Sequence, residues 1–231
     1  MHAFLLRGIL QLSAGGPIGI EVDRRMDIEK LEEELARARD ELRKVQAERG
    51  STARQLDAFD RLANAQRALA KAKGEEYAAP YDIGFVPEAA VSEPRFFQTE
   101  RASLLTFSAV REKANWRRED AGYGLVEIVH CCTSSFGGPG DEDIEKDPLY
   151  AKGLHAYGVF EIVNSRWKRL LSEHGGLYFP GTPGPGQRHF VFTFHDSTFQ
   201  CIASDLRCMT LEPPFENVLA EVRKRCKLPG S

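Results

Sequence analysis

The sequence lacks the features that would tie it to a membrane or to nucleic acid. Its 231 residues carry a formal net charge of only -3, so no global positive field attracts nucleic acid. No segment approaches the roughly 18 apolar residues of a membrane-spanning helix. The apolar N-terminal stretch has no charged n-region and is interrupted by Arg7. We therefore expect a strand at residues 4–12 and no secretory signal there.

Cysteine is scarce, and its spacing matches no common motif. Five cysteines cannot all form pairs with one another, and the C-x₂-C pair of a standard zinc knuckle is absent. We therefore expect reduced thiols and a cytoplasmic protein. The five are Cys131, Cys132, Cys201, Cys208 and Cys226.

Residues 27–73 contain no proline and only one glycine, Gly50. Before Gly50, apolar residues recur at alternating spacings of three and four, which is typical of a heptad seam. After a break at Gly50 and Ser51, a second apolar series follows. This pattern predicts an antiparallel two-helix coiled-coil hairpin with arms of about 20 residues, or about 30 Å. The two series are Ile28, Leu31, Leu35, Ala38, Leu42 and Val45, and then Leu56, Phe59, Leu62 and Leu69.

The clearest strand signal lies in residues 188–195, where phenylalanine recurs at every second position. Phe190, Phe192 and Phe194 fall on one side, as expected for a strand packed against a core. Asp196-Ser197-Thr198 supplies turn-forming side chains, and the apolar run 199–203 then predicts an antiparallel partner. Weaker patterns predict strands at residues 18–22, 103–110 and 123–133, an amphipathic helix over residues 157–171, and a last helix after Pro213-Pro214.

These elements favour an α+β fold, because strands come in pairs and helices separate the pairs. We predict an antiparallel sheet with helices on one face and a protruding antiparallel two-helix coiled-coil hairpin. Residues 1–26 would supply the first two strands of the α+β body, residues 27–73 the helical hairpin arm, and residues 74–231 the main part of the body.

One part of the chain resembles known sequences. The run 194–203 (F-H-D-S-T-F-Q-C-I-A), together with the upstream segments G-P-G-D-E and F-E-I-V-N-S-R-W, resembles segments in a family of uncharacterised bacterial proteins. The resemblance covers roughly residues 126–204 and none of the arm. It implies that the C-terminal part is a recurring domain with the arm as a variable addition, and it implies no activity and no residue role.

His195, Asp196 and Ser197 are the three residue types of a hydrolase triad, but they are adjacent. Neighbours on a strand point to opposite faces, whereas a triad must converge. A hairpin turn with a local Asp or Ser hydrogen bond is the simpler interpretation. His195 alone is the better catalytic candidate, as a general base or ligand, and its alternative is a hydrogen-bonded structural histidine.

A second candidate site follows the strand predicted at residues 123–133. His130 and Cys132 would share one face of a regular strand, and Cys201 on another strand could approach them. This set could bind zinc, or Cys131 or Cys132 could be a catalytic thiolate. The alternative is that these cysteines are buried and structural, as free cysteines commonly are.

Carboxylates crowd the glycine-rich loop that begins near residue 137. They could bind Ca²⁺ or Mg²⁺, although their spacing does not fit an EF-hand. The simpler interpretation is a solvated acidic loop in which one Asp caps a short helical turn. The residues are Asp141, Glu142, Asp143, Glu145 and Asp147.

Two functional hypotheses follow. The first is a cytoplasmic protein-interaction or ligand-binding module that uses the coiled-coil arm for self-association or partner docking, since a second copy would cover the apolar flanks of an isolated hairpin. The second is a hydrolytic or metal-assisted enzyme with its pocket between residues 123–133 and 188–204, using His195 and Asp196 with Cys132.

Overall fold

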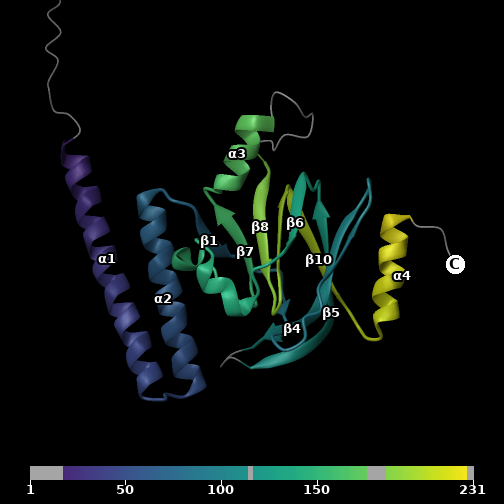
Figure 1. Cartoon of the computed structure of the whole chain (residues 1–231), viewed down its shortest axis with the longest axis horizontal. Helices are drawn as coiled ribbons and strands as arrows, with labels where there is room; N and C mark the ends of the chain where they lie inside the picture. The colour runs from purple at the N-terminus through teal and green to yellow at the C-terminus, as the bar shows by residue number, and fades with distance from the viewer. Residues whose placement is uncertain (1–17, 114–116, 176–185, 228–231) are drawn as a thin grey trace, which may run out of the picture.

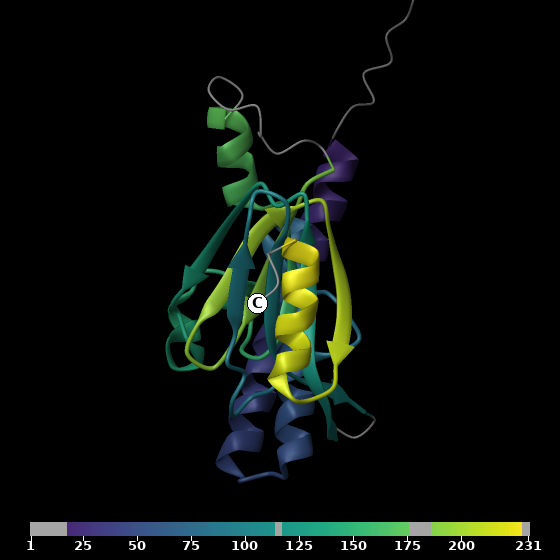
Figure 2. The same ribbon diagram turned by 90° about the vertical axis from the view of Figure 1, so that its right-hand side faces the viewer.

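The computed structural model describes residues 18–113, 117–175 and 186–227. It confirms the α+β class: two five-stranded antiparallel sheets pack face to face, with helices outside them (Figure 1 and Figure 2). Between the sheets lies a core rich in phenylalanine, to which Phe107 contributes from one sheet and Phe192 and Phe199 from the other. None of the helices in the described ranges is long and apolar enough to cross a membrane.

Sheet A has the strand order β1-β7-β8-β9-β6, and sheet B has the order β10-β5-β4-β2 with β3 also paired to β4. All pairs are antiparallel. The strands of sheet A are β1 (Tyr77–Pro80), β7 (Val159–Val163), β8 (Arg188–Thr193), β9 (Thr198–Ala203) and β6 (Thr133–Gly137). Those of sheet B are β10 (Asp205–Leu211), β5 (Arg118–Val129), β4 (Ser103–Glu112), β2 (Val86–Pro87) and β3 (Arg95–Gln98).

The hairpin predicted at residues 188–203 is confirmed as β8 and β9, and it lies in the middle of sheet A. Phe190, Phe192 and Phe194 enter the core between the sheets. Val191 points to the other face, where it packs with Ile144 and other apolar residues. Sheet A is therefore covered on both faces, which explains why every residue from 189 to 194 is buried.

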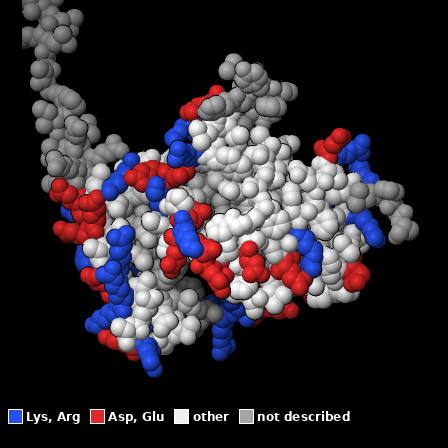
Figure 3. All heavy atoms as spheres, viewed as in Figure 1, with Lys and Arg blue, Asp and Glu red and all other residues white. Residues whose placement is uncertain are grey.

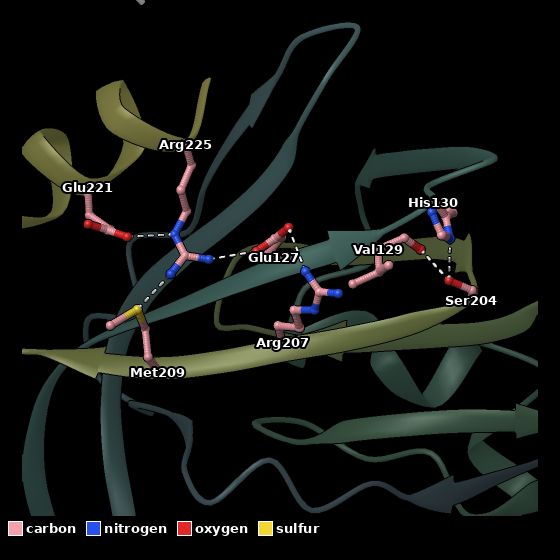
Figure 4. Close-up of polar contacts among 8 residues, drawn as sticks. All are labelled: Glu127, Val129, His130, Ser204, Arg207, Met209, Glu221 and Arg225. Carbon is pink, nitrogen blue, oxygen red and sulfur yellow. Dashed lines mark hydrogen bonds and ion pairs between the residues drawn. The ribbon is translucent and has the colours of Figure 1, made fainter. Parts of the chain in front are cut away.

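Helix α4 (Phe215–Cys226) covers the outer face of sheet B. Its buried Val218 and Val222 pack on residues of β4 and β5, including Leu125. Arg225 fastens the helix to the sheet: its guanidinium bonds Glu127 on β5 at 2.6 Å and Glu221 on α4 at 2.7 Å (Figure 4).

The predicted helical pair is present as α1 (Ile18–Ala47) and α2 (Thr52–Lys73), with Ser51 as the N-cap of α2. Ion pairs between the helices, such as Arg61 with Glu41 at 2.7 Å, lie on the outside. Figure 3 shows acidic and basic side chains interspersed over the helical pair on the left of that view. The pair is not a free arm, because α2 packs on β1 and on the short helix η3 (Tyr150–Lys152).

Several predicted elements are wrong. The strand expected at residues 18–22 lies inside α1, and the strand expected at residues 4–12 falls outside the described residues. The helix expected over residues 157–171 is strand β7 followed by α3 (Arg166–Gly175). The break has a local cause: Asn164 has a left-handed φ of 56°, and the Ser165 hydroxyl accepts a hydrogen bond from Lys168 N, which starts α3.

The structure also contains more strands than the sequence patterns predict. Residues 74–98, where the sequence patterns predict no strand, contain β1, β2 and β3, and β10 likewise has no predicted counterpart. The predicted strand at residues 123–133 is divided between β5, which already begins at Arg118, and β6. Helices cover the outer faces of both sheets, not one, because each sheet has an apolar outer surface of its own.

Candidate functional site

A cleft of about 730 Å³ lies between α2 and the β body. Its walls come from α2, from the residues around the end of β1, from the ends of β4 and β5, and from the segment leading into β7. The lining combines aromatic rings with charged groups, which is the composition of many small-molecule sites. The aromatic, charged and imidazole side chains of the lining include Phe59, Asp60, Arg67, Glu112, Arg118, His155 and Tyr157.

One face of α2 forms the first wall. It carries Leu56, then Phe59 and Asp60 about one helical turn later, and Arg67 about two turns after Asp60. This spacing projects the four side chains to the same side of the helix. Asp60 forms no hydrogen bond or ion pair within the described ranges. Burial raises the pKa of Asp60, while His155 and Arg67 act to lower it. The carboxylate is thus desolvated on the cleft wall without a direct partner.

His155 lies opposite, between two phenylalanine rings. Its imidazole meets Phe59 edge-on at 5.7 Å and Phe160 at 4.8 Å between ring centroids. Nδ1 lies 3.0 Å from the carbonyl oxygen of Ala156. Because a carbonyl can only accept, Nδ1 carries the proton and Nε2 keeps its lone pair. Burial lowers the pKa of His155, so the ring is neutral at physiological pH.

Tyr157 lines the cleft and also bonds the polar side chains of Asp141 and His195. The residue has a φ of 58°, and its hydroxyl donates a hydrogen bond to Asp141. The same Asp141 oxygen lies 3.0 Å from His195 Nδ1, and the Tyr157 hydroxyl lies 3.2 Å from that nitrogen. Burial and the bond to Asp141 raise the pKa of Tyr157 to about 12, so it stays a protonated donor.

The Asp141 loop is drawn close to His195 by backbone contacts. Asp141 N donates to His195 O at 2.7 Å, and a Cβ on Gly140 would lie 2.6 Å from the same oxygen. Asp141 raises the pKa of His195, and the bonds from Tyr157 and His195 lower the pKa of Asp141. The pair orients the imidazole with Nδ1 toward Asp141 and leaves Nε2 as its outward nitrogen.

The structure therefore gives the predicted catalytic residue His195 a different partner. Asp196 lies 3.9 Å from Nε2 with its side chain 93% exposed, whereas Asp141 is 21% exposed. Asp141 appeared in the sequence only as part of an acidic loop. The loop folds into the short helix η2 (Asp141–Lys146), where Lys146 pairs with Asp143. Its carboxylates form no metal-binding group with other described residues.

Cys132 does not join His195. Cys132 N bonds Ile202 O at 2.8 Å near the end of β9, whereas His195 precedes Thr198 at its start. At about 3.3 Å per residue, Thr198 and Ile202 are roughly 13 Å apart along this strand. Burial raises the pKa of Cys132, which disfavours a thiolate.

The predicted zinc set of His130, Cys132 and Cys201 is also not assembled. No three His, Cys, Asp or Glu side chains in the described part of the chain come together as metal ligands. Cys201 is fully buried in the core between the sheets. His130 is exposed and bonds the Ser204 hydroxyl at 3.0 Å, as Figure 4 shows. The correction follows from strand geometry, because Cys201 faces the inter-sheet core.

A separate groove of about 570 Å³ lies beside α3 and β8. In it, the Ser165 hydroxyl lies 2.8 Å from His189 Nδ1, and His189 Nε2 lies 3.2 Å from Gln200 Oε1. The arrangement resembles a nucleophile and its base. However, burial lowers the pKa of His189 to about 4, which makes it a weak base, and Ser165 already caps α3. We assign this network a structural role.

No family model, curated protein or solved structure matches this chain.

Proposed function

We propose that the protein is a ligand-binding module that holds a small organic molecule in the cleft between α2 and the β body. The observation that carries this proposal is the convergence of Asp60, Arg67, His155 and Tyr157 on one cleft of about 730 Å³. Small-molecule sites commonly occupy about 300–1,000 Å³. Titratable groups with displaced pKa values also gather preferentially at functional sites.

In this proposal α2 of the helical pair has a defined role as one wall of the site. Self-association through the pair has less support. The large hydrophobic side chains of residues 27–73 are all at least partly covered, since the exposed ones in the described ranges are Val91, Phe136, Leu170 and Met209. The apolar flanks that suggest a homodimer or a docked protein partner are thus already partly covered within the chain.

A hydrolytic reaction is the weaker alternative. Asp141 supplies His195 with an orienting carboxylate. However, His195 does not line the cleft, and neither does Cys132. The five cysteines are free thiols, in keeping with a reducing compartment such as the cytoplasm.

The proposal is tested by screening a library of fragment-sized compounds against the ¹⁵N-labelled full chain by NMR. We expect hits to shift the amide signals of α2 and of residues 155–160. A Leu56→Trp variant, which places an indole in the cleft, should abolish these shifts. Ala53→Trp, on the exposed side of the same helix, is the matched control and should retain them. Hits that bind elsewhere, or that bind the Leu56→Trp protein equally well, would overturn the proposal.

A further inference from the structure

We propose that the ligand of this cleft is an organic cation, namely an amine carried on an aromatic or similarly flat apolar body. This inference depends on the proposed function and adds the chemical class of the ligand. It follows from which charged groups of the cleft are already engaged and which remain available.

Both guanidinium groups of the cleft already bond protein acceptors. Arg67 donates from Nη1 to Gly153 O at 3.2 Å and from Nη2 to Asn64 Oδ1 at 2.7 Å. Arg118 donates to Glu112 Oε1 at 2.9 Å. Each guanidinium thus already has protein acceptors against it, with N–H donors left over.

The carboxylates, in contrast, retain free capacity. Among the described residues Asp60 has no hydrogen-bond or ion-pair partner, and Glu112 uses only one of its two oxygens in the contacts with Arg118. Three carboxylates and two guanidinium groups line the cleft, and His155 is neutral. The formal charge of the lining is therefore negative, and the desolvated Asp60 carboxylate is stabilised by any cation that reaches it.

The apolar part of the lining suits a flat cation. Phe59 and Tyr157 present aromatic surface on opposite walls, and aromatic faces attract ammonium groups. Tyr81, which also lines the cleft, already holds a cation in this way within the protein. The Arg188 guanidinium lies 4.7 Å from the centroid of the Tyr81 ring. An amine on an aromatic body would pair with Asp60 and stack its ring on these walls.

The experiment compares two probes of similar shape and opposite charge, 2-phenylethylamine and 3-phenylpropionate, by NMR titration of the full chain. We expect the amine to bind in the cleft about tenfold or more tighter than the acid, as one charge-assisted hydrogen bond provides. Asp60→Asn should remove that preference and Asp60→Glu should largely restore it. Asp57→Asn, a carboxylate of α2 outside the cleft lining, should leave it unchanged.

The inference is overturned if the acid binds as tightly as the amine, or if Asp60→Asn leaves the affinity for the amine unaltered while the variant is folded. If neutral compounds shift the cleft signals and the amine does not, the ligand is not an organic cation. The cleft would then still be a ligand-binding site. If no compound shifts those signals, both proposals fail.

Discussion

The side chain of Arg67 lies directly against Gly153. Arg67 Nη1 donates to Gly153 O at 3.2 Å, and a Cβ on Gly153 would lie 2.4 Å from Arg67 Cγ. Gly153 has a φ of 94°, which L side chains rarely adopt. This contact joins α2 to the segment that carries His155 and Tyr157, so it sets the relation between the two walls of the cleft.

Replacing Gly153 with alanine should therefore destabilise the protein and loosen α2. We expect the free energy of unfolding to fall by about 1–3 kcal/mol, from backbone strain and from the displaced Arg67 side chain. Denaturant unfolding measures this change. Gly186→Ala is the control, because a Cβ there meets nothing within 4 Å. Equal stability of the two variants would show that the Arg67 contact does not hold α2 in place.

The buried His189 should make the protein sensitive to mild acid. Burial lowers its pKa from 6.5 to about 4, so the unfolded chain binds this proton at a higher pH than the folded protein. Stability is therefore lost as pH falls from about 6.5 toward 4, by up to about 3 kcal/mol. Unfolding free energies measured between pH 7 and pH 4.5 should show the decline.

A His189→Gln variant tests that assignment. Its stability at pH 7 should be lower, because the bonds to Ser165 and Gln200 are altered, but its decline across the same pH interval should be smaller. An identical decline in both proteins would place the acid sensitivity in other groups.

The pKa of His195 should be higher than that of an ordinary histidine. Its pKa is raised by the hydrogen bond and charge of Asp141, so the contribution of this pair to stability is present below the unfolded pKa and is lost as pH rises through the folded pKa. NMR titration of the imidazole signals should show the raised midpoint. Asp141→Asn should lower it clearly, whereas Asp196→Asn should lower it less, because Asp196 is 3.9 Å away and exposed. The reverse order would assign the orienting carboxylate to Asp196.

The cysteines should be poor nucleophiles in the folded protein. Burial raises the pKa values of Cys131, Cys132 and Cys201, and that of Cys208 to about 12. Alkylation by iodoacetamide at pH 8, followed by mass spectrometry, should be slower at each of them than at free cysteine, and slowest at Cys201. The denatured chain, in which all sites react, is the reference. Faster labelling of Cys132 than of free cysteine would restore the thiolate hypothesis.

The sequence predicted the elements whose periodicity is unambiguous. The β8–β9 hairpin and the helical pair are of this kind, since alternation in one and heptad spacing in the other fit no second structure. Strand β7 was mistaken for helix because Phe160 and Val163 are three residues apart and the strand is covered on both faces. A strand buried on both sides need not alternate polar and apolar residues, and β7 lacks the phenylalanine at every second position that identifies β8.

The candidate site could not be predicted from the sequence, for a different reason. Asp60 and Tyr157 are far apart in the chain and meet only because α2 packs beside β1 and the segment before β7. His195 could be singled out as a histidine beside a turn, but its partner Asp141 belongs to a loop 54 residues earlier. Neither pairing leaves a spacing in the sequence from which it could be predicted.

The chain passes between the two sheets twice at one corner. Only Ser204 separates β9 from β10, residues 130–132 separate β5 from β6, and the His130–Ser204 hydrogen bond ties the two passages together. The two sheets are therefore joined twice by the chain itself at this corner. Strands β6 and β1 are opposite edges of sheet A, so the cleft beside β1 lies at the edge of the sheet farthest from this covalent junction.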